Sequence, residues 1–262
     1  MCHRNTVARM KEFPLGVVFL SEYMGTTLLL LLGIGVSANT TLKRSFGYGR
    51  DWLLVSFGWA FAVFVGASVA WRSGAQLNPA VTLAQALTDS ISWDLVPIYL
   101  LAQMLGAMTG AFLAYLTYKK QFDTHDDPAN TGGIFFTSAS VQAPRWNVVS
   151  EAVGAFVLVY WVLESSPFQL GIGDAAPSFG NSALGYAAVA FTVLAVGASL
   201  GGPTGYAINP ARDLGPRIVY AILPLAGKGS ANWGYAWVPV VGPLLGAAVA
   251  VGLFWIGAAE GA

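Results

Sequence analysis

Six long apolar stretches divide the 262-residue chain. Each has roughly the 20 residues that an α-helix needs to cross a lipid bilayer. Charged residues make up only 10% of the chain and hydrophobic residues 55%, whereas about a quarter of the residues in soluble domains are charged. The sequence therefore predicts an all-α membrane protein with six transmembrane helices, at residues 16–38, 53–71, 95–118, 147–163, 183–200 and 237–257.

The first apolar stretch follows a short basic segment that contains Arg4, Arg9 and Lys11. A charged segment before an apolar run is also typical of a signal peptide. The run from Gly16 to Ala38 is longer than a signal core and includes Glu22, so we expect a retained membrane helix after an N-terminal segment of residues 1–14.

Composition and motifs exclude several functions. Thirteen basic residues balance thirteen acidic ones, so no excess positive charge is available for nucleic acid. Cys2 has no second cysteine to pair with, and His3 and His125 lie in polar segments. No catalytic triad, metal-ligand set or phosphate-binding loop is present in the sequence. We therefore expect neither an enzyme nor a bound cofactor or metal.

An internal repeat organises the chain. The segment Ser21–Gly25 resembles Ser150–Gly154, 129 residues later, and the segment around Asn78 resembles that around Asn209, 131 residues later. The chain thus contains two copies of a unit with three transmembrane spans. Because three is odd, the second copy is inverted in the membrane relative to the first. We expect a first repeat at 15–118, a connecting loop at 119–146, a second repeat at 147–257 and a tail at 258–262.

Each repeat contains an Asn-Pro-Ala motif, formed by Asn78, Pro79 and Ala80 and by Asn209, Pro210 and Ala211. Asn is a favoured N-cap, and Pro at the first helical position loses no hydrogen bond. One such motif can be a chance capped turn. Two at matched positions, each opening an apolar segment too short to cross the bilayer, predict half-helices at 78–87 and 209–220.

Paired Asn-Pro-Ala motifs in inverted three-helix repeats resemble the aquaporin superfamily, the major intrinsic proteins. The stretch GGPTGYAINPARDLGPR, residues 201–217, is most similar to bacterial glycerol uptake facilitators, in which an Asp follows the Arg as Asp213 follows Arg212 here. The resemblance implies a passive channel for glycerol, similar small neutral solutes and water that excludes protons and ions. It also implies a homotetramer in a bacterial cytoplasmic membrane, with both termini in the cytoplasm.

The resemblance further implies that the two half-helices are re-entrant and meet at their N-termini near the bilayer centre. Asn78 and Asn209 then donate hydrogen bonds to the permeating oxygen, and the positive helix ends repel cations. Backbone carbonyl groups before each Asn form a ladder for hydroxyl groups. The ladder residues are Gly74, Ala75, Gln76, Leu77, Gly205, Ala207 and Ile208.

By the same resemblance, Arg212 lies at the narrowest part of the pore, with Gly197 and Tyr206. The family's fourth filter position falls on Gly58 without a gap, or on Trp59 if one residue is deleted near Trp71. The neighbouring sequence favours Trp59. Trp59 and Tyr206 would then form an apolar corner opposite Arg212, with Gly197 leaving room. Tyr206 replaces a more usual Phe, and Gln76 a usual His.

Glu22 and Glu151 lie at matching positions in the first and fourth spans. Intramembrane carboxyl groups mark either an ion-coupled site or a structural role. Their symmetry favours structural support of the segments before the half-helices, and we assign Asp213 to the same class. A water-selective pore and a coupled transporter remain alternatives. The distribution of Lys and Arg disagrees with cytoplasmic termini, because seven basic residues in the predicted loops would then lie outside and four inside.

Overall fold

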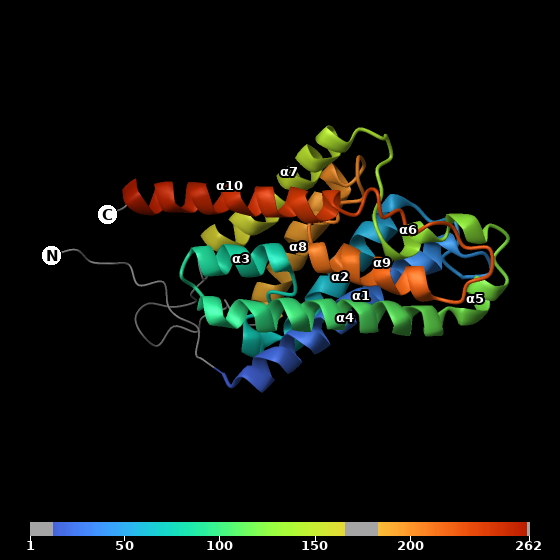
Figure 1. Ribbon diagram of the computed structural model, residues 1–262, viewed down its shortest axis with the longest axis horizontal. Helices are drawn as coiled ribbons and strands as arrows, with labels where there is room; N and C mark the ends of the chain where they lie inside the picture. Colours follow the sequence, from blue (N-terminus) through green and yellow to red (C-terminus); the bar gives the residue numbers. More distant parts are fainter. Residues whose placement is uncertain (1–12, 166–182, 261–262) are drawn as a thin grey trace.

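The computed structural model describes residues 13–165 and 183–260 of the chain. Within these ranges the protein is helical, and its long helices run roughly along one axis (Figure 1). The six long helices are α1 (Leu15–Thr41), α2 (Trp52–Val69), α4 (Val96–Thr117), α7 (Pro144–Glu164), α8 (Ala183–Leu200) and α10 (Val238–Glu260). Five segments are long and apolar enough to cross a membrane, and α8, which begins at the edge of the described residues, is a shorter apolar helix.

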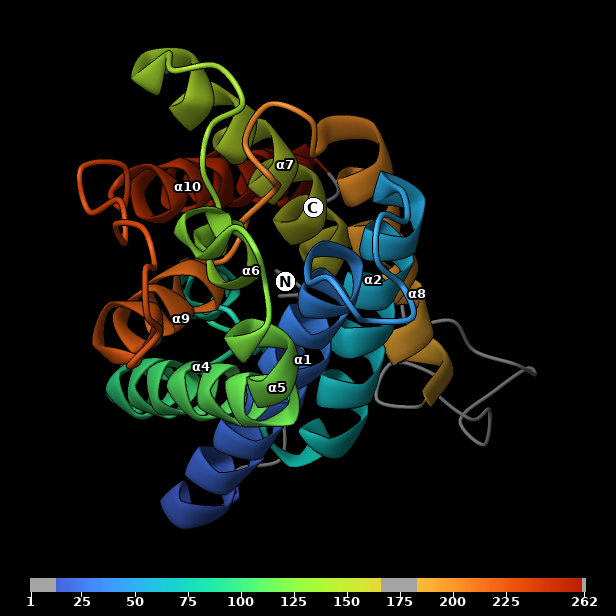
Figure 2. The same ribbon diagram turned by 90° about the vertical axis from the view of Figure 1, so that its right-hand side faces the viewer.

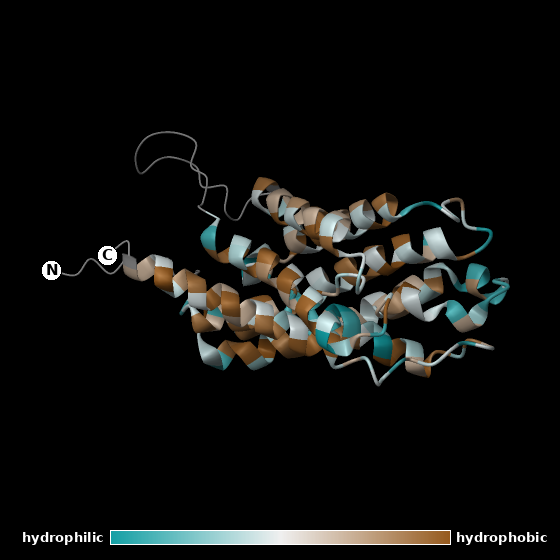
Figure 3. Cartoon of the chain, turned by 90° about the horizontal axis from the view of Figure 1, so that it is seen from above, coloured by the Kyte–Doolittle hydropathy of each residue, from teal (hydrophilic) through white to brown (hydrophobic). Residues whose placement is uncertain are grey.

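Two short helices match the predicted half-helices: α3 (Pro79–Leu87) and α9 (Pro210–Ile222). In Figure 1 they extend toward opposite ends of the molecule, α3 toward the end where α10 finishes and α9 toward the end that carries α5 (Lys119–Asp123) and α6 (Gly132–Phe135). The apolar residues follow the long helices, and polar residues gather in the loops (Figure 3).

Several predicted boundaries were wrong by a few residues. Helix α1 continues to Thr41 rather than ending at residue 38, and α9 ends at Ile222 rather than 220. Helix α7 begins at Pro144 inside the predicted 119–146 loop, because Pro is well suited to the first helical position. The same loop contains α5 and α6. Residues 258–260 of the predicted tail belong to α10.

The helix pairs repeat the two-fold pattern of the sequence. Helix α1 lies against α4 as α7 lies against α10, and α2 lies beside α8 where the two repeats meet (Figure 2). Each half-helix also contacts the third span of the other repeat, α9 against α4 and α3 against α10. These contacts between the repeats place both half-helices inside the helix bundle.

Paired glycines permit the closest helix contacts. Gly106 and Gly110 of α4 face α1, and a Cβ atom at Gly110 would lie 2.4 Å from the carbonyl oxygen of Thr27. In the second repeat Gly246 of α10 faces α7, where a Cβ atom would lie 2.2 Å from the Ala152 carbonyl oxygen. Small residues four apart let membrane helices approach closely, since lipid provides no hydrophobic force between them.

Candidate pore and selectivity filter

Both half-helices are capped by the Asn of their motif. The side-chain oxygen of Asn78 accepts a hydrogen bond from Ala80 N at 2.9 Å, and that of Asn209 accepts from Ala211 N at 3.0 Å and Arg212 N at 3.2 Å. Pro follows each Asn at the first helical position. The caps fix each carboxamide with its oxygen toward its own helix and its NH2 group away from it.

The two caps are joined to each other across the repeats. Asn78 Nδ2 donates to the carbonyl oxygen of Ile208 at 2.9 Å, and Asn209 Nδ2 donates to that of Leu77 at 2.8 Å. The N-termini of α3 and α9 therefore meet at one place in the molecule. Each NH2 group carries two hydrogens. Within the described part of the chain, one hydrogen of each makes this cross-link, and the other makes no hydrogen bond to the protein.

The segments before the caps have an unusual backbone. Positive φ angles occur at Gly74 (82°), Ala75 (54°) and Leu77 (52°), and again at Gly205 (80°), Tyr206 (39°) and Ile208 (44°). Left-handed φ angles disfavour non-glycine residues by about 1–2 kcal/mol each. These segments hold the predicted carbonyl ladders. The last carbonyl of each, at Leu77 and Ile208, already accepts one hydrogen bond from the opposite Asn.

Glu22 and Glu151 hold this backbone in place. Glu22 accepts hydrogen bonds from Gln76 N at 3.0 Å and Leu77 N at 2.8 Å. Glu151 accepts from Ala207 N at 2.9 Å and Ile208 N at 2.7 Å. Both side chains are almost fully buried, at 0% and 1% exposure. Each carboxyl group thus satisfies two donors of a strained loop that lies inside the membrane-spanning bundle, where lipid offers no partners.

Two residues that the sequence analysis did not identify complete the Glu22 site. Ser73 Oγ donates to Glu22 at 2.5 Å and Gln103 Nε2 at 2.7 Å. Gln103 lies on α4 and also donates to Thr82 of α3 at 2.9 Å. Nothing in the sequence distinguishes Gln103 from other polar residues in an apolar helix, because its partners lie more than 20 residues away.

Arg212 contacts an aromatic side chain of α2. Its guanidinium carbon lies 3.7 Å from the centre of the Trp59 ring, and its Nη1 donates to the Phe135 carbonyl oxygen at 3.4 Å. The Trp59 Nε1 donates to Ser37 Oγ of α1 at 3.2 Å, which fixes the indole. A Cβ atom at Gly58 would instead meet Val36 of α1, 2.5 Å away. Trp59 is therefore the residue of α2 beside Arg212, and Gly58 belongs to the α1–α2 contact.

The predicted arrangement of this corner was wrong in one respect. We expected Trp59 to face Arg212 from the opposite wall, but the guanidinium group lies directly on the indole face. A planar cation is attracted to the negative face of an aromatic ring, and the attraction is larger where water is excluded.

Tyr206 and Gly197 lie together, with an unexpected third residue. A Cβ atom at Gly197 would be 2.8 Å from Tyr206 Cζ, so Gly197 makes room for the Tyr206 ring. Trp52, which the sequence analysis did not identify, packs edge to face with Tyr206 at 5.6 Å between ring centres. Its Nε1 donates to the Gly197 carbonyl oxygen at 2.8 Å. These contacts fix the aromatic ring of Tyr206.

Asp213 is buried away from Arg212 in an ion pair with Arg217, 2.7 Å away. It also accepts hydrogen bonds from Thr137 N at 2.8 Å and Thr137 Oγ1 at 2.7 Å. Arg217 donates to the carbonyl oxygens of Thr137, Ala231 and Asn232. This network joins α9 to the 119–146 loop, whose Phe135 carbonyl contacts Arg212. Arg217 and Thr137 are further residues that the sequence analysis did not identify.

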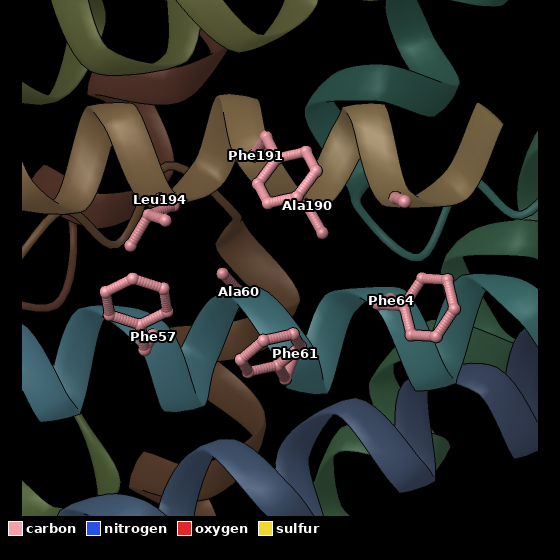
Figure 4. A pocket seen from close by; sticks show the side chains of 8 residues that line it. Phe57, Ala60, Phe61, Phe64, Ala190, Phe191 and Leu194 are labelled. Atoms are coloured by element: carbon pink, nitrogen blue, oxygen red, sulfur yellow. The ribbon is translucent and has the colours of Figure 1, made fainter. Parts of the chain in front are cut away.

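An apolar groove lies between α2 and α8, outside the segments described above (Figure 4). Its lining has no polar surface, so it offers no hydrogen-bonding group to a hydroxylated solute. Among the described residues no three His, Cys, Asp or Glu side chains gather as a metal site would require.

Comparison with known proteins identifies the family. The profile of the Major intrinsic protein family matches residues 10–254. The glycerol uptake facilitator protein of Bacillus subtilis is 46% identical over 244 residues, covering 93% of this chain and 85% of the relative. A probable glycerol uptake facilitator protein of Thermotoga maritima is 43% identical, with 91% and 99% covered.

A solved structure has the same fold. The X-ray structure of the aquaglyceroporin from Plasmodium falciparum matches with a TM-score of 0.75 and 29% identity, covering 92% of this chain and 96% of that one. The inverted repeats, the joined half-helices and these matches lead to one conclusion: this multi-pass membrane protein belongs to the Major intrinsic protein family of channels and is not an enzyme.

Proposed function

We propose that the chain is a passive channel for glycerol and similar small neutral polyols, and that it also conducts water. The observation that carries this proposal is the corner formed by Arg212, Trp59 and the fixed ring of Tyr206. It combines the donors of Arg212, which lies on the face of the Trp59 ring, with the apolar ring of Tyr206. A polyol has hydroxyl groups along a carbon backbone. Relatives with 46% and 43% identity are described as glycerol uptake facilitators, which supports the same solute.

The arrangement of donors and acceptors suits stepwise passage of hydroxyl groups. Arg212 only donates hydrogen bonds, and the carbonyl ladders only accept them. At the centre, each Asn NH2 group has one hydrogen committed to the opposite repeat and one left for the solute. A solute thus exchanges water for protein partners throughout, which lowers the free energy of desolvation.

The same geometry opposes the entry of cations. Arg212 carries a full positive charge, and the N-termini of α3 and α9 each contribute roughly half a positive charge at the place where they meet. Because oxygen atoms there accept hydrogen bonds from fixed Asn donors, a water at this point cannot pass a proton along a hydrogen-bonded chain. We therefore propose that protons and metal cations are excluded.

One observation favours a water-selective pore as a second candidate. Arg212 lies on the Trp59 ring at 3.7 Å, so the two groups have no space for a carbon backbone between them. Glycerol conduction then needs the polyol to pass beside this pair, along Tyr206. A coupled transporter has less support, because the acceptor atoms of Glu22 and Glu151 are occupied by backbone donors.

The deciding experiment uses the purified chain in liposomes. After a sudden rise in external glycerol, vesicles should shrink and then reswell faster than protein-free vesicles, while in sorbitol they should shrink and stay small. The reswelling rate should be the same at different pH values and with or without sodium. Shrinkage without faster reswelling in glycerol would identify a water-selective pore, and dependence on a proton or sodium gradient would identify a transporter.

We further propose a homotetramer with one pore in each subunit and both termini in the cytoplasm. The helix start at Leu15 and the helix end at Glu260 lie toward the same end of the molecule, which supports a shared side (Figure 1). Light scattering of the protein in detergent, corrected for bound detergent, measures the number of subunits.

A further inference from the structure

The side chain of Gln76 is buried without a partner. It is 6% exposed, and both Nε2 and Oε1 lack hydrogen-bond partners among the described residues. A carboxamide has one acceptor oxygen and two donor hydrogens. Burying such a group unpaired is unfavourable, and native proteins rarely do so without a reason.

The surrounding backbone holds Gln76 where it is. Its own N–H and that of Leu77 bond to Glu22, and Ala75 and Leu77 on either side have left-handed φ angles. The chain therefore cannot easily shift to give the carboxamide a protein partner. Gln76 precedes Asn78 by two residues, within the segment that leads to the centre where α3 and α9 meet.

Comparison of the two repeats shows that the polar side chains are distributed unequally. With Asn78 aligned on Asn209, Gln76 corresponds to Ala207 and Arg212 corresponds to Val81. Besides the Asn of its motif, the half that contains α9 thus has a guanidinium group and no carboxamide at these two positions. Besides the Asn of its motif, the half that contains α3 has the Gln76 carboxamide and no guanidinium group there. Each half carries one strong hydrogen-bonding side chain beside its motif, at a different position.

We propose that the Gln76 carboxamide is a second binding group for solute hydroxyls, in the half of the pore opposite Arg212. A hydroxyl group both donates and accepts, and a carboxamide pairs with both of these functions. Because it is neutral, it adds no charge at a place where the helix ends are already positive. The inference rests on the proposed function, since it assigns a further specificity-determining residue to that pore.

The test compares Gln76→Leu with wild type in liposomes, measuring glycerol and water permeability at equal protein content. Loss of one hydrogen-bonding group should lower glycerol permeability by about tenfold, while water permeability changes little because a small solute needs fewer partners. Gln85→Leu is the matched control on the same half-helix, where the side chain is partly exposed, and it should match wild type.

A second variant keeps the test decisive if Gln76→Leu folds poorly. Gln76→His replaces the carboxamide with a group that titrates near pH 6.5, so its glycerol permeability should fall as the pH drops through that range, while wild type stays constant. Wild-type behaviour of Gln76→Leu, or a pH-independent Gln76→His, would overturn the proposal. Failure of wild type itself to conduct glycerol would instead reject the proposed function.

Discussion

Arg212 and Arg217 lie on the same half-helix and differ in how their donors are used. Arg217 is completely buried, pairs with Asp213 and donates to three backbone carbonyl oxygens. Arg212 bonds one side-chain nitrogen to the Phe135 carbonyl oxygen at 3.4 Å and stacks on Trp59. An arginine within a membrane protein generally faces a partner or water. Arg217 is thus a structural arginine, whereas the single side-chain hydrogen bond of Arg212 among the described residues agrees with the role in solute binding that we propose for it.

Arg212→Val should admit cations. Removing the guanidinium group takes away a full charge from a region of low dielectric, so proton conductance should rise about tenfold or more. A pH-sensitive dye trapped in liposomes measures this rise under an imposed potential. Arg212→Lys is the matched control, because it keeps the charge and loses the planar fork. The Arg212→Lys protein should keep the low proton conductance of wild type and conduct glycerol less well. Equal proton leakage in wild type and Arg212→Val would show that Arg212 does not contribute to the exclusion of protons.

Trp59→Ala should relax the discrimination between glycerol and longer polyols. The change removes the ring beneath Arg212 and widens the passage, so reswelling in a four- or five-carbon polyol should become faster relative to glycerol, while water still passes. Tyr206→Phe should retain glycerol conduction, since the apolar surface comes from the ring, which Trp52 holds in place.

Gly58→Leu separates the two alignments of the filter. Its side chain would clash with Val36 of α1, 2.5 Å from a Cβ atom at Gly58, so we expect weaker α1–α2 packing and a lower yield of folded protein. A Gly58→Leu protein that folds normally but conducts neither water nor glycerol would instead assign Gly58 to the pore and contradict the assignment of Trp59.

At the scale of elements, the half-helices depend on partners in other elements. Helix α3 has nine residues and α9 thirteen, and isolated helices this short are marginal in water. Asn caps begin them, the two Glu residues hold their preceding loops, and Lys228 Nζ donates to the carbonyl oxygens of Tyr220, Ala221 and Leu223 where α9 ends. The stability of the two half-helices therefore depends on tertiary contacts with other elements.

Glu151→Gln should lower stability more than it lowers transport by the folded protein. An amide keeps one acceptor oxygen and introduces an NH2 group that faces the backbone donors of Ala207 and Ile208. Leaving a buried donor unpaired costs about 1–3 kcal/mol, so the melting temperature in detergent should fall. Glu164→Gln, at an exposed position near the end of α7, should melt like wild type. A wild-type melting temperature for Glu151→Gln would reject the structural role.

Gly246→Leu should prevent folding, because a Cβ atom there would lie 2.2 Å from the Ala152 carbonyl oxygen and would push α10 away from α7. Overpacking of a close contact typically costs 1–3 kcal/mol or more, and here it involves backbone that cannot move aside. Gly257→Leu is the control on the same helix, where nothing lies within 4 Å. Size-exclusion chromatography in detergent should show aggregation for the first variant and a single peak for the second.

At the scale of the whole molecule, the count of Lys and Arg residues in the loops disagrees with the proposed orientation of the protein in the membrane. We expect residues 42–51 to lie outside the cell, although they contain three basic residues. In this loop Lys43 pairs with Asp126, and the backbone N–H of Lys43 bonds to His125 Nδ1 at 3.2 Å. Beside the Lys43 ammonium group, the pKa of Asp126 is lowered, which keeps the carboxylate ionised. Part of the positive charge is thus neutralised in the folded state.

Cysteine labelling tests this orientation. In a Cys2→Ser background, Phe46→Cys should react with a membrane-impermeant maleimide in intact cells, because Phe46 is fully exposed in the 42–51 loop. Ser92→Cys, in the exposed loop between α3 and α4, should react only after the cells are opened. The reverse pattern would place the termini outside.

The sequence by itself determined the six spans, the inverted repeat, the two half-helix starts and the family resemblance, because these depend on local composition, capping chemistry and spacing along the chain. Only the tertiary structure decided which side chain of α2 lies beside Arg212, that Gly197 accommodates the Tyr206 ring, and that Gln103, Trp52 and Arg217 support the pore. Those assignments depend on contacts between residues far apart in sequence. A shift of one residue turns a helical side chain by about 100°, which is enough to move it from the pore to a helix contact.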